Sequence, residues 1–143
     1  MAIDLDRFVE AQDSVYERAL GELHAGAKRS HLIWFIFPQL RGLGHSAMAW
    51  KFGIESRAEA KVYLAHPVLG PRLIACTEAV NAVHARSAHQ IFGSPDDLKF
   101  RSCLTLFAAV PGASSVFAIA LTKFFEGMPD PVTIQKLREQ DAV

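Results

Sequence analysis

The sequence predicts an all-α fold, a compact domain of six or seven helices. Apolar residues recur at three- and four-residue spacing along most of the chain, as in helices that bury one face. Half of the 143 residues are hydrophobic, which is ample material for a core. The length is that of one domain, which would bury roughly 70% of the surface exposed by its unfolded chain. We therefore expect residues 1–143 to form a single all-α domain.

The first helix is expected over Leu5–Leu23, with Asp13 able to cap a restart within it. Gly26 fits a left-handed stop after its end. The apolar run Leu32–Phe37 fits either a buried strand or a buried helical turn. No second strong strand candidate is present to pair with it, and a lone strand leaves backbone groups unpaired. The run is therefore expected to be helical.

A capping box begins the next helix. Ser56 would accept a hydrogen bond from the backbone N–H of Glu59, whose carboxylate would reach back. That helix should end at His66, because the residue before a proline avoids helical geometry. The clearest helical periodicity follows, over Leu69–Val83.

Another helix start lies at Ser94, with Pro95 at the first helical position and two acidic residues in the first turn. Its apolar positions end at Phe107. Two more helices are expected, one over residues 116–124 and one that starts at Asp130.

Composition excludes several broad classes of protein. Fifteen basic and fifteen acidic residues give zero formal net charge, which argues against general nucleic-acid binding or an anionic-membrane binder. Neither a signal peptide nor a bilayer-spanning apolar run is present, so we expect a cytoplasmic protein. Cys76 and Cys103 both lie in apolar helical patterns and are expected to be reduced core residues.

Standard catalytic signatures are absent, including a Walker loop, a G-x-S-x-G elbow and H-E-x-x-H. Arg41–Gly44 holds half of a dinucleotide fingerprint, but its glycines more simply permit a tight turn. No two histidines have the i, i+4 spacing that places both on one helix face. No cofactor or metal is therefore expected.

The basic cluster at residues 28–31 is the first part of a candidate anion site. Arginine offers a planar fork for phosphate or carboxylate, lysine adds a point charge, and the start of the Ser94 helix would add backbone donors. A solvated loop is the alternative interpretation. The cluster's candidate ligand-binding residues are Lys28, Arg29 and His31.

A polar row with three-residue spacing lies on the helix after Ser94, where it could form the opposite wall of the same pocket. It could equally be an ordinary helix surface, with Ser and Thr bonded to their own backbone. The row consists of Asp96, Lys99, Ser102 and Thr105. The segment after the apolar run adds Gln39, His45 and Ser46 to the rim of the pocket.

Three stretches in order, KRSH with WFIFPQLRGLG, then YLAHPVLGPRL, then GSPDDLKFRSCLTLF, resemble the bacterial domain-of-unknown-function family 1810. The resemblance runs from Phe8 to about Thr133 and implies an all-α fold. It implies no activity, so no catalytic role is carried over. Some members are labelled calpastatin, but calpain-inhibitory segments are flexible and polar, whereas this chain is half hydrophobic.

The first functional hypothesis is a binding protein for a small anionic ligand, a nucleotide or phosphorylated metabolite. The second is an enzyme in which His31 or His45 acts as acid or base and Asp96 orients it. A faint similarity to families that act on ADP-ribose-type N-glycosides suggests that bond as a substrate. The third is an interaction module or homo-oligomer that uses the region of Phe124 and Phe125.

Overall fold

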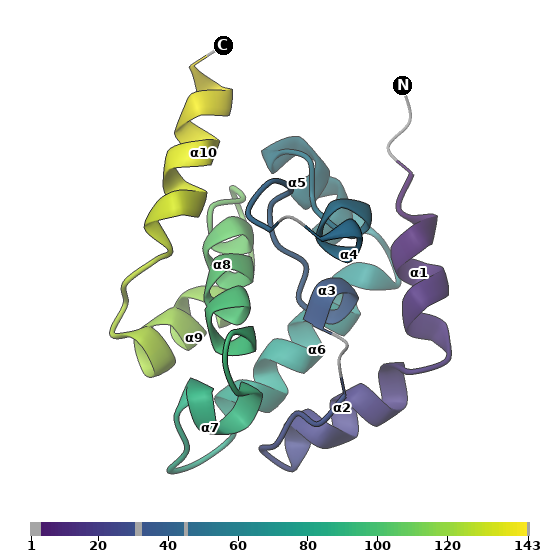
Figure 1. Cartoon of the computed structure of the whole chain (residues 1–143), viewed down its shortest axis with the longest axis vertical. Coiled ribbons are helices and arrows are strands. Elements are labelled where there is room, and N and C mark those ends of the chain that lie inside the picture. The colour runs from purple at the N-terminus through teal and green to yellow at the C-terminus, as the bar shows by residue number, and fades with distance from the viewer. Residues whose placement is uncertain (1–3, 31–32, 45, 143) are drawn as a thin grey trace.

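Ten helices make up the regular structure of the chain in a computed structural model that describes residues 4–30, 33–44 and 46–142. Figure 1 shows α8 between α10 on one side and α3 on the other. The helices are α1 (Asp6–Asp13), α2 (Tyr16–His24), α3 (Ile33–Ile36), α4 (Ala47–Lys51), α5 (Arg57–Ala65), α6 (Leu69–Asn81), α7 (Ala88–Phe92), α8 (Asp96–Ala108), α9 (Val116–Phe125) and α10 (Pro131–Asp141).

The all-α prediction is confirmed, but the expected number of six or seven helices is wrong. Three of the helices, α3, α4 and α7, have only four or five residues. An element of one turn is too short to display the periodicity from which helices are recognised. The stretch Leu5–Leu23 also divides into α1 and α2.

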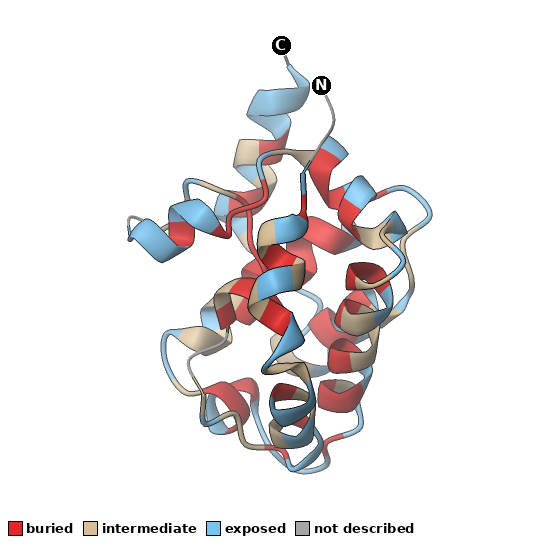
Figure 2. Cartoon of the chain, turned by 90° about the vertical axis from the view of Figure 1, so that its right-hand side faces the viewer, coloured by how far each residue is buried: buried red, intermediate tan, exposed pale blue. Residues whose placement is uncertain are grey.

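The hydrophobic core is built around α8, which packs against α3, α5, α7, α9 and α10. Phe100 of α8 is fully buried, with its ring centroid 4.5 Å from that of Phe92 and 4.9 Å from that of Phe37. Figure 2 shows the buried faces turned inward and the last turns of α10 exposed. Aromatic packing thus fixes α8 relative to α3 and α7.

Two of the expected helix caps take a different form. Pro95 itself is the N-cap residue of α8, and the Ser94 side chain makes no capping hydrogen bond. Val15, not Asp13, is the N-cap residue of α2. In both cases the chain enters the helix through backbone hydrogen bonds, Leu98 N–H to the Pro95 carbonyl and Ala19 N–H to the Val15 carbonyl.

The capping box at Ser56 is only half formed. Ser56 Oγ accepts the Glu59 N–H at 3.2 Å, as expected. The Glu59 carboxylate instead accepts the N–H of Glu55 and pairs with Arg7. The buried glutamate therefore joins α1 to α5.

The apolar run that precedes the glycine turn is helical over Ile33–Ile36, and Leu32 lies outside the described residues. After α3 the chain extends, and Leu40 forms a parallel bridge with Ile54. Ile54 N–H donates to the Gln39 carbonyl at 2.9 Å, and Arg41 N–H donates to the Ile54 carbonyl at 2.8 Å. This bridge fixes the backbone of Gln39 at the end of the run.

Within the described ranges, every helix falls short of the length and apolar character needed to cross a bilayer. Cys76 and Cys103 are both free thiols in the core. Burial raises the pKa of the Cys76 thiol to about 12, and burial likewise raises the pKa of Cys103 well above its usual value. Both side chains therefore act as small hydrophobic groups.

Candidate functional site

An open cleft of about 270 Å³ lies where α3, the glycine turn, α8 and the start of α10 meet. We call it the Trp34 cleft. Three segments far apart in sequence, residues 34–44, 95–102 and 130–132, contribute to its walls, so only the folded chain creates it. Its lining residues are Trp34, Gln39, Leu43, Gly44, Pro95, Leu98, Lys99, Ser102, Asp130 and Val132.

Lys99 is the cation of the cleft. Its Nζ lies 3.9 Å from the centroid of the Trp34 ring, an arrangement in which the ring face attracts the positive charge. The same Nζ lies 3.4 Å from Oδ1 of Asp96. Oδ2 of Asp96 is held more closely by Lys28, at 2.7 Å. Two ammonium groups therefore share one carboxylate, and the trio carries a net positive charge.

Asp130 is the carboxylate of the cleft and the N-cap residue of α10. Its Oδ2 lies 2.9 Å from Ser102 Oγ, 2.5 Å from Thr133 Oγ1 and 3.3 Å from Thr133 N. Its own N–H donates to Thr105 Oγ1 at 2.8 Å. Three contacts on one oxygen fix the orientation of the carboxylate, and among the described residues none donates a hydrogen bond to Oδ1.

Gln39 and Gly44 form the wall opposite α8. A Cβ atom on Gly44 would lie 2.9 Å from the Cβ of Ala49 and 4.0 Å from both Gln39 Nε2 and the edge of Trp34. Only glycine fits without movement of α4, and its small size leaves the Gln39 amide open to the cleft. Gln39 is only 8% exposed.

The structure brings together part of the predicted set of site residues. Gln39, Lys99 and Ser102 line the Trp34 cleft. Lys28 and Asp96 lie behind Lys99 as its ion-pair network.

The other predicted residues lie behind the cleft, elsewhere or outside the described ranges. Thr105 supports the backbone of Asp130 from behind, and its hydroxyl donates to the Arg101 carbonyl. Arg29 is exposed and lies outside the cleft lining, and Ser46 is the exposed N-cap of α4. His31 and His45 lie outside the described residues.

Backbone donors at the start of α8 are also not available to an anion as expected. The N–H groups of Asp97, Leu98 and Lys99 donate to the carbonyl oxygens of Gly93 and Pro95. The first turn of α8 therefore contributes side chains, and not free amides, to the cleft.

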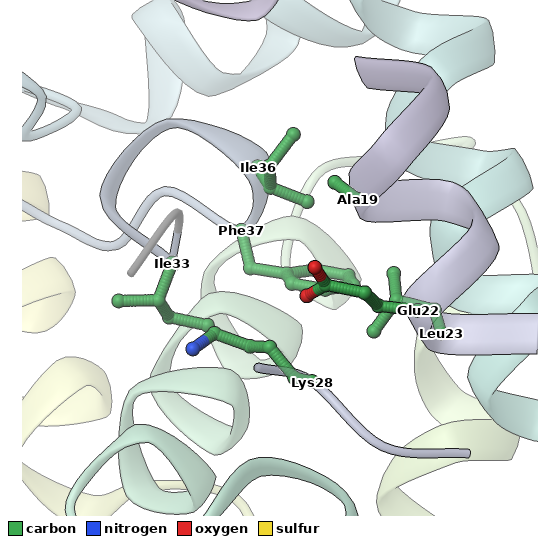
Figure 3. A pocket seen from close by; sticks show the side chains of 7 residues that line it. All are labelled: Ala19, Glu22, Leu23, Lys28, Ile33, Ile36 and Phe37. Atoms are coloured by element: carbon green, nitrogen blue, oxygen red, sulfur yellow. The ribbon is translucent and has the colours of Figure 1, made fainter. Parts of the chain in front are cut away.

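A second, much smaller pocket of about 10 Å³ separates α2 from α3. Figure 3 shows the side chain of Lys28 beside Ile33 and Phe37, with Glu22 and Ala19 across the gap. This volume suits about one water molecule, not a ligand. Lys28 thus lines this small pocket and is linked to the Trp34 cleft through Asp96, which also pairs with Lys99.

Asp130 is the site residue that sequence reasoning missed, since an Asp-Pro pair at a helix start is explained by capping alone. One signal was present: Ser102 and Thr105, on the polar row, are the residues that hold it. Among the described residues, no three His, Cys, Asp or Glu side chains gather closely enough to hold a metal ion.

A family model described as "Protein of unknown function (DUF1810)" matches residues 2–137. A similar solved structure is the crystal structure of a conserved hypothetical protein from Mycobacterium tuberculosis, with 51% sequence identity and a TM-score of 0.93. That similarity covers 94% of this chain and 96% of the other. Comparison with curated proteins finds no match.

Proposed function

Because the chain belongs to the DUF1810 family of proteins of unknown function, we propose from the geometry of the Trp34 cleft that it binds a small anionic ligand, a nucleotide or phosphorylated metabolite. The observation that carries the proposal is the sharing of Asp96 by Lys28 and Lys99. One carboxylate does not balance two ammonium groups, so Lys99 keeps positive charge to offer a ligand.

The position of Lys99 supports the same function. Its side chain is 22% exposed, so the ammonium is partly removed from water yet still reachable. An ion pair in such a place is screened less by salt than one on the open surface. Trp34, whose ring lies under the Lys99 ammonium, adds aromatic surface to the cleft, and Leu43 and Leu98 add apolar surface. Small-molecule sites combine an apolar lining with a few polar groups in this way.

Titration calorimetry at low ionic strength with inorganic phosphate, pyrophosphate and adenosine monophosphate tests the proposal. We expect at least one to bind, and Lys99→Met to weaken its binding about tenfold or more, since hydrogen bonds to charged groups contribute about 1.5–3 kcal/mol. Lys61→Met, an exposed lysine on α5 outside the cleft, is the matched control and should bind as the wild type does. Absence of binding by all three, or equal binding by the Lys99 variant, would overturn the proposal.

The described residues give less support to the two other hypotheses. Asp96, expected to orient a catalytic histidine, is occupied by Lys28 and Lys99. Phe124 and Phe125, expected at a docking surface, are half-buried against Phe100, with ring centroids 6.3 and 6.2 Å from it.

A further inference from the structure

Two polar groups of the Trp34 cleft, Asp130 and Gln39, are not explained by the positive charge of Lys99. Within the described ranges, the hydrogen bonds to the Asp130 carboxylate all reach Oδ2, and none reaches Oδ1 or the side-chain amide of Gln39. Gln39 is more than nine-tenths buried as a residue, and its amide is not among the solvent-excluded unpaired side-chain atoms, so the amide opens on the cleft. Both groups line the cleft, so a ligand in it is the available partner.

The cleft also keeps its opposite charges apart. Lys99 pairs with Asp96, and no ion pair joins it to Asp130, although both line the same cleft. Ser102, one turn after Lys99 on α8, holds Asp130 through Oδ2. A ligand that matches this arrangement has an anionic group at one end and hydrogen-bond donors at the other.

Hydrogen-bonding capacity distinguishes the possible donors. An ionised carboxylate only accepts, whereas the Gln39 amide both donates and accepts. A hydroxyl group can donate to Asp130 and accept from Gln39 at once. An ammonium group can donate to Asp130 and to the Gln39 carbonyl oxygen but leaves the amide N–H unpaired, whereas two neighbouring hydroxyl groups can pair with both ends of the amide. A plain alkyl group would leave both residues unpaired at a cost of about 1–3 kcal/mol each.

We infer that the ligand of the Trp34 cleft is a polyhydroxylated phosphate, with its phosphate at Lys99 and a hydroxyl group between Asp130 and Gln39. This inference rests on the proposed function. A sugar phosphate and the ribose phosphate of a nucleotide share this chemistry. The cleft, at about 270 Å³, is near the lower limit of small-molecule sites, which span about 300–1,000 Å³.

Three phosphates that differ in their hydroxyl groups test the inference by titration calorimetry on the full chain. Propyl phosphate has none, glycerol 3-phosphate has two on the same carbon chain, and ribose 5-phosphate has a sugar ring. We expect the hydroxylated ligands to bind about tenfold more tightly than propyl phosphate. A comparison of ribose 5-phosphate with adenosine monophosphate then separates a sugar phosphate from a nucleotide as the source.

Asp130→Asn should lower the ratio of the affinities for hydroxylated phosphates and for propyl phosphate to about one. The reason is that an amide nitrogen replaces one carboxylate oxygen. Asparagine is an equally good N-cap, so α10 should keep its start. Asp97→Asn removes the same charge from the first turn of α8, outside the cleft, and should keep the preference. Gln39→Met is a second variant that should also lower the preference for hydroxylated ligands.

The outcomes separate the inference from the proposed function. Equal affinity for propyl phosphate and glycerol 3-phosphate overturns the inference and leaves anion binding in place. Tightest binding of phosphoethanolamine overturns it in favour of an ammonium group at Asp130. Failure of every phosphate to bind overturns both. A hydroxyl preference that persists in both the Asp130 and Gln39 variants also overturns the inference.

Discussion

The ammonium of Lys28 lies 2.7 Å from Oδ2 of Asp96, and the two side chains are only 10% and 16% exposed. Lys28 does not line the Trp34 cleft, yet it determines how much of the Asp96 charge remains for Lys99. The Lys28–Asp96 pair, which lies outside the cleft lining, is thus joined through Asp96 to Lys99 within it.

Variants of this pair are expected to change anion affinity in opposite directions. Lys28→Met leaves Asp96 paired with Lys99 alone, so phosphate binding should weaken several-fold. Asp96→Asn leaves both lysines unbalanced, so phosphate binding should strengthen. Calorimetric titration with inorganic phosphate, after circular dichroism has shown both variants folded, measures the effects. Changes of the same sign would contradict the shared-carboxylate arrangement.

A second prediction concerns the ion pair of the partly exposed Arg7 with the buried Glu59, whose Nη2 and Oε1 lie 3.0 Å apart. Arg7 also donates to the carbonyl oxygens of Lys51 and Gly53 and so ties α1 to the segment before α5. Arg7→Met leaves a buried carboxylate unpaired and should destabilise the fold by about 3–5 kcal/mol, measured by urea unfolding.

The exposed pair of Arg57 and Asp141 provides the control for this prediction. Its side chains are 37% and 55% exposed, so Arg57→Met should cost only about 0–1 kcal/mol. The double variant Arg7→Met with Glu59→Gln should recover part of the stability that Arg7→Met loses, because the buried charge is removed. Similar costs for the two arginine variants would refute the assignment of Glu59 as a buried charge.

The longer helices were predictable because each carries its own signal. The periodicity of Leu69–Val83 gives α6, and Asp130 with Pro131 gives the start of α10. The short helices α3, α4 and α7 are too short to show periodicity, although Ser46 and the Ser87–Gln90 capping box mark the starts of α4 and α7. They depend on contacts from elsewhere, such as the Leu40–Ile54 bridge after α3.

The cleft lining was best predictable where its residues share one element, although Gln39 was also named from the segment after α3. Lys99 and Ser102 were found because one helix face brings them together. Asp130 was missed because its place depends on α10 folding back against α8, through contacts 28 residues away in sequence. Arg29, the sequence neighbour of Lys28, is exposed and lies outside the cleft lining.

A third prediction uses two glycines with opposite surroundings. An added Cβ on Gly70 would lie 2.1 Å from the Leu64 carbonyl oxygen, which the backbone holds in place. Gly70→Ala should therefore cost about 1–3 kcal/mol or more. Gly21, within α2, has no atom within 4 Å of an added Cβ, so Gly21→Ala should stabilise the protein by about 0.5–1 kcal/mol. Thermal unfolding of both variants measures the two changes in stability. Changes of the same sign would contradict the close approach of α5 and α6 at Gly70.

The last prediction concerns the pH dependence of the loop that leads to α3. Glu22 accepts hydrogen bonds from the Arg29 and Ser30 N–H groups, at 2.8 and 2.9 Å, and from Ser30 Oγ at 2.6 Å. Burial alone would raise the pKa of Glu22, but these bonds and the charge of Arg18 together hold it below its usual 4.5.

A lowered pKa means that the folded protein binds this proton less readily than the unfolded chain does. The stabilisation by Glu22 is therefore fully present above about pH 4.5 and is lost as pH falls through the lower, folded pKa. Glu22→Gln should unfold more easily near neutral pH and lose less stability than the wild type on acidification. Urea unfolding from pH 7 to pH 3 measures how the free energy of unfolding of the variant and of the wild type changes with pH. Glu17→Gln, an exposed glutamate on the same helix, is the control, and a Glu22 variant that keeps the wild-type slope would contradict the proposed role of the carboxylate.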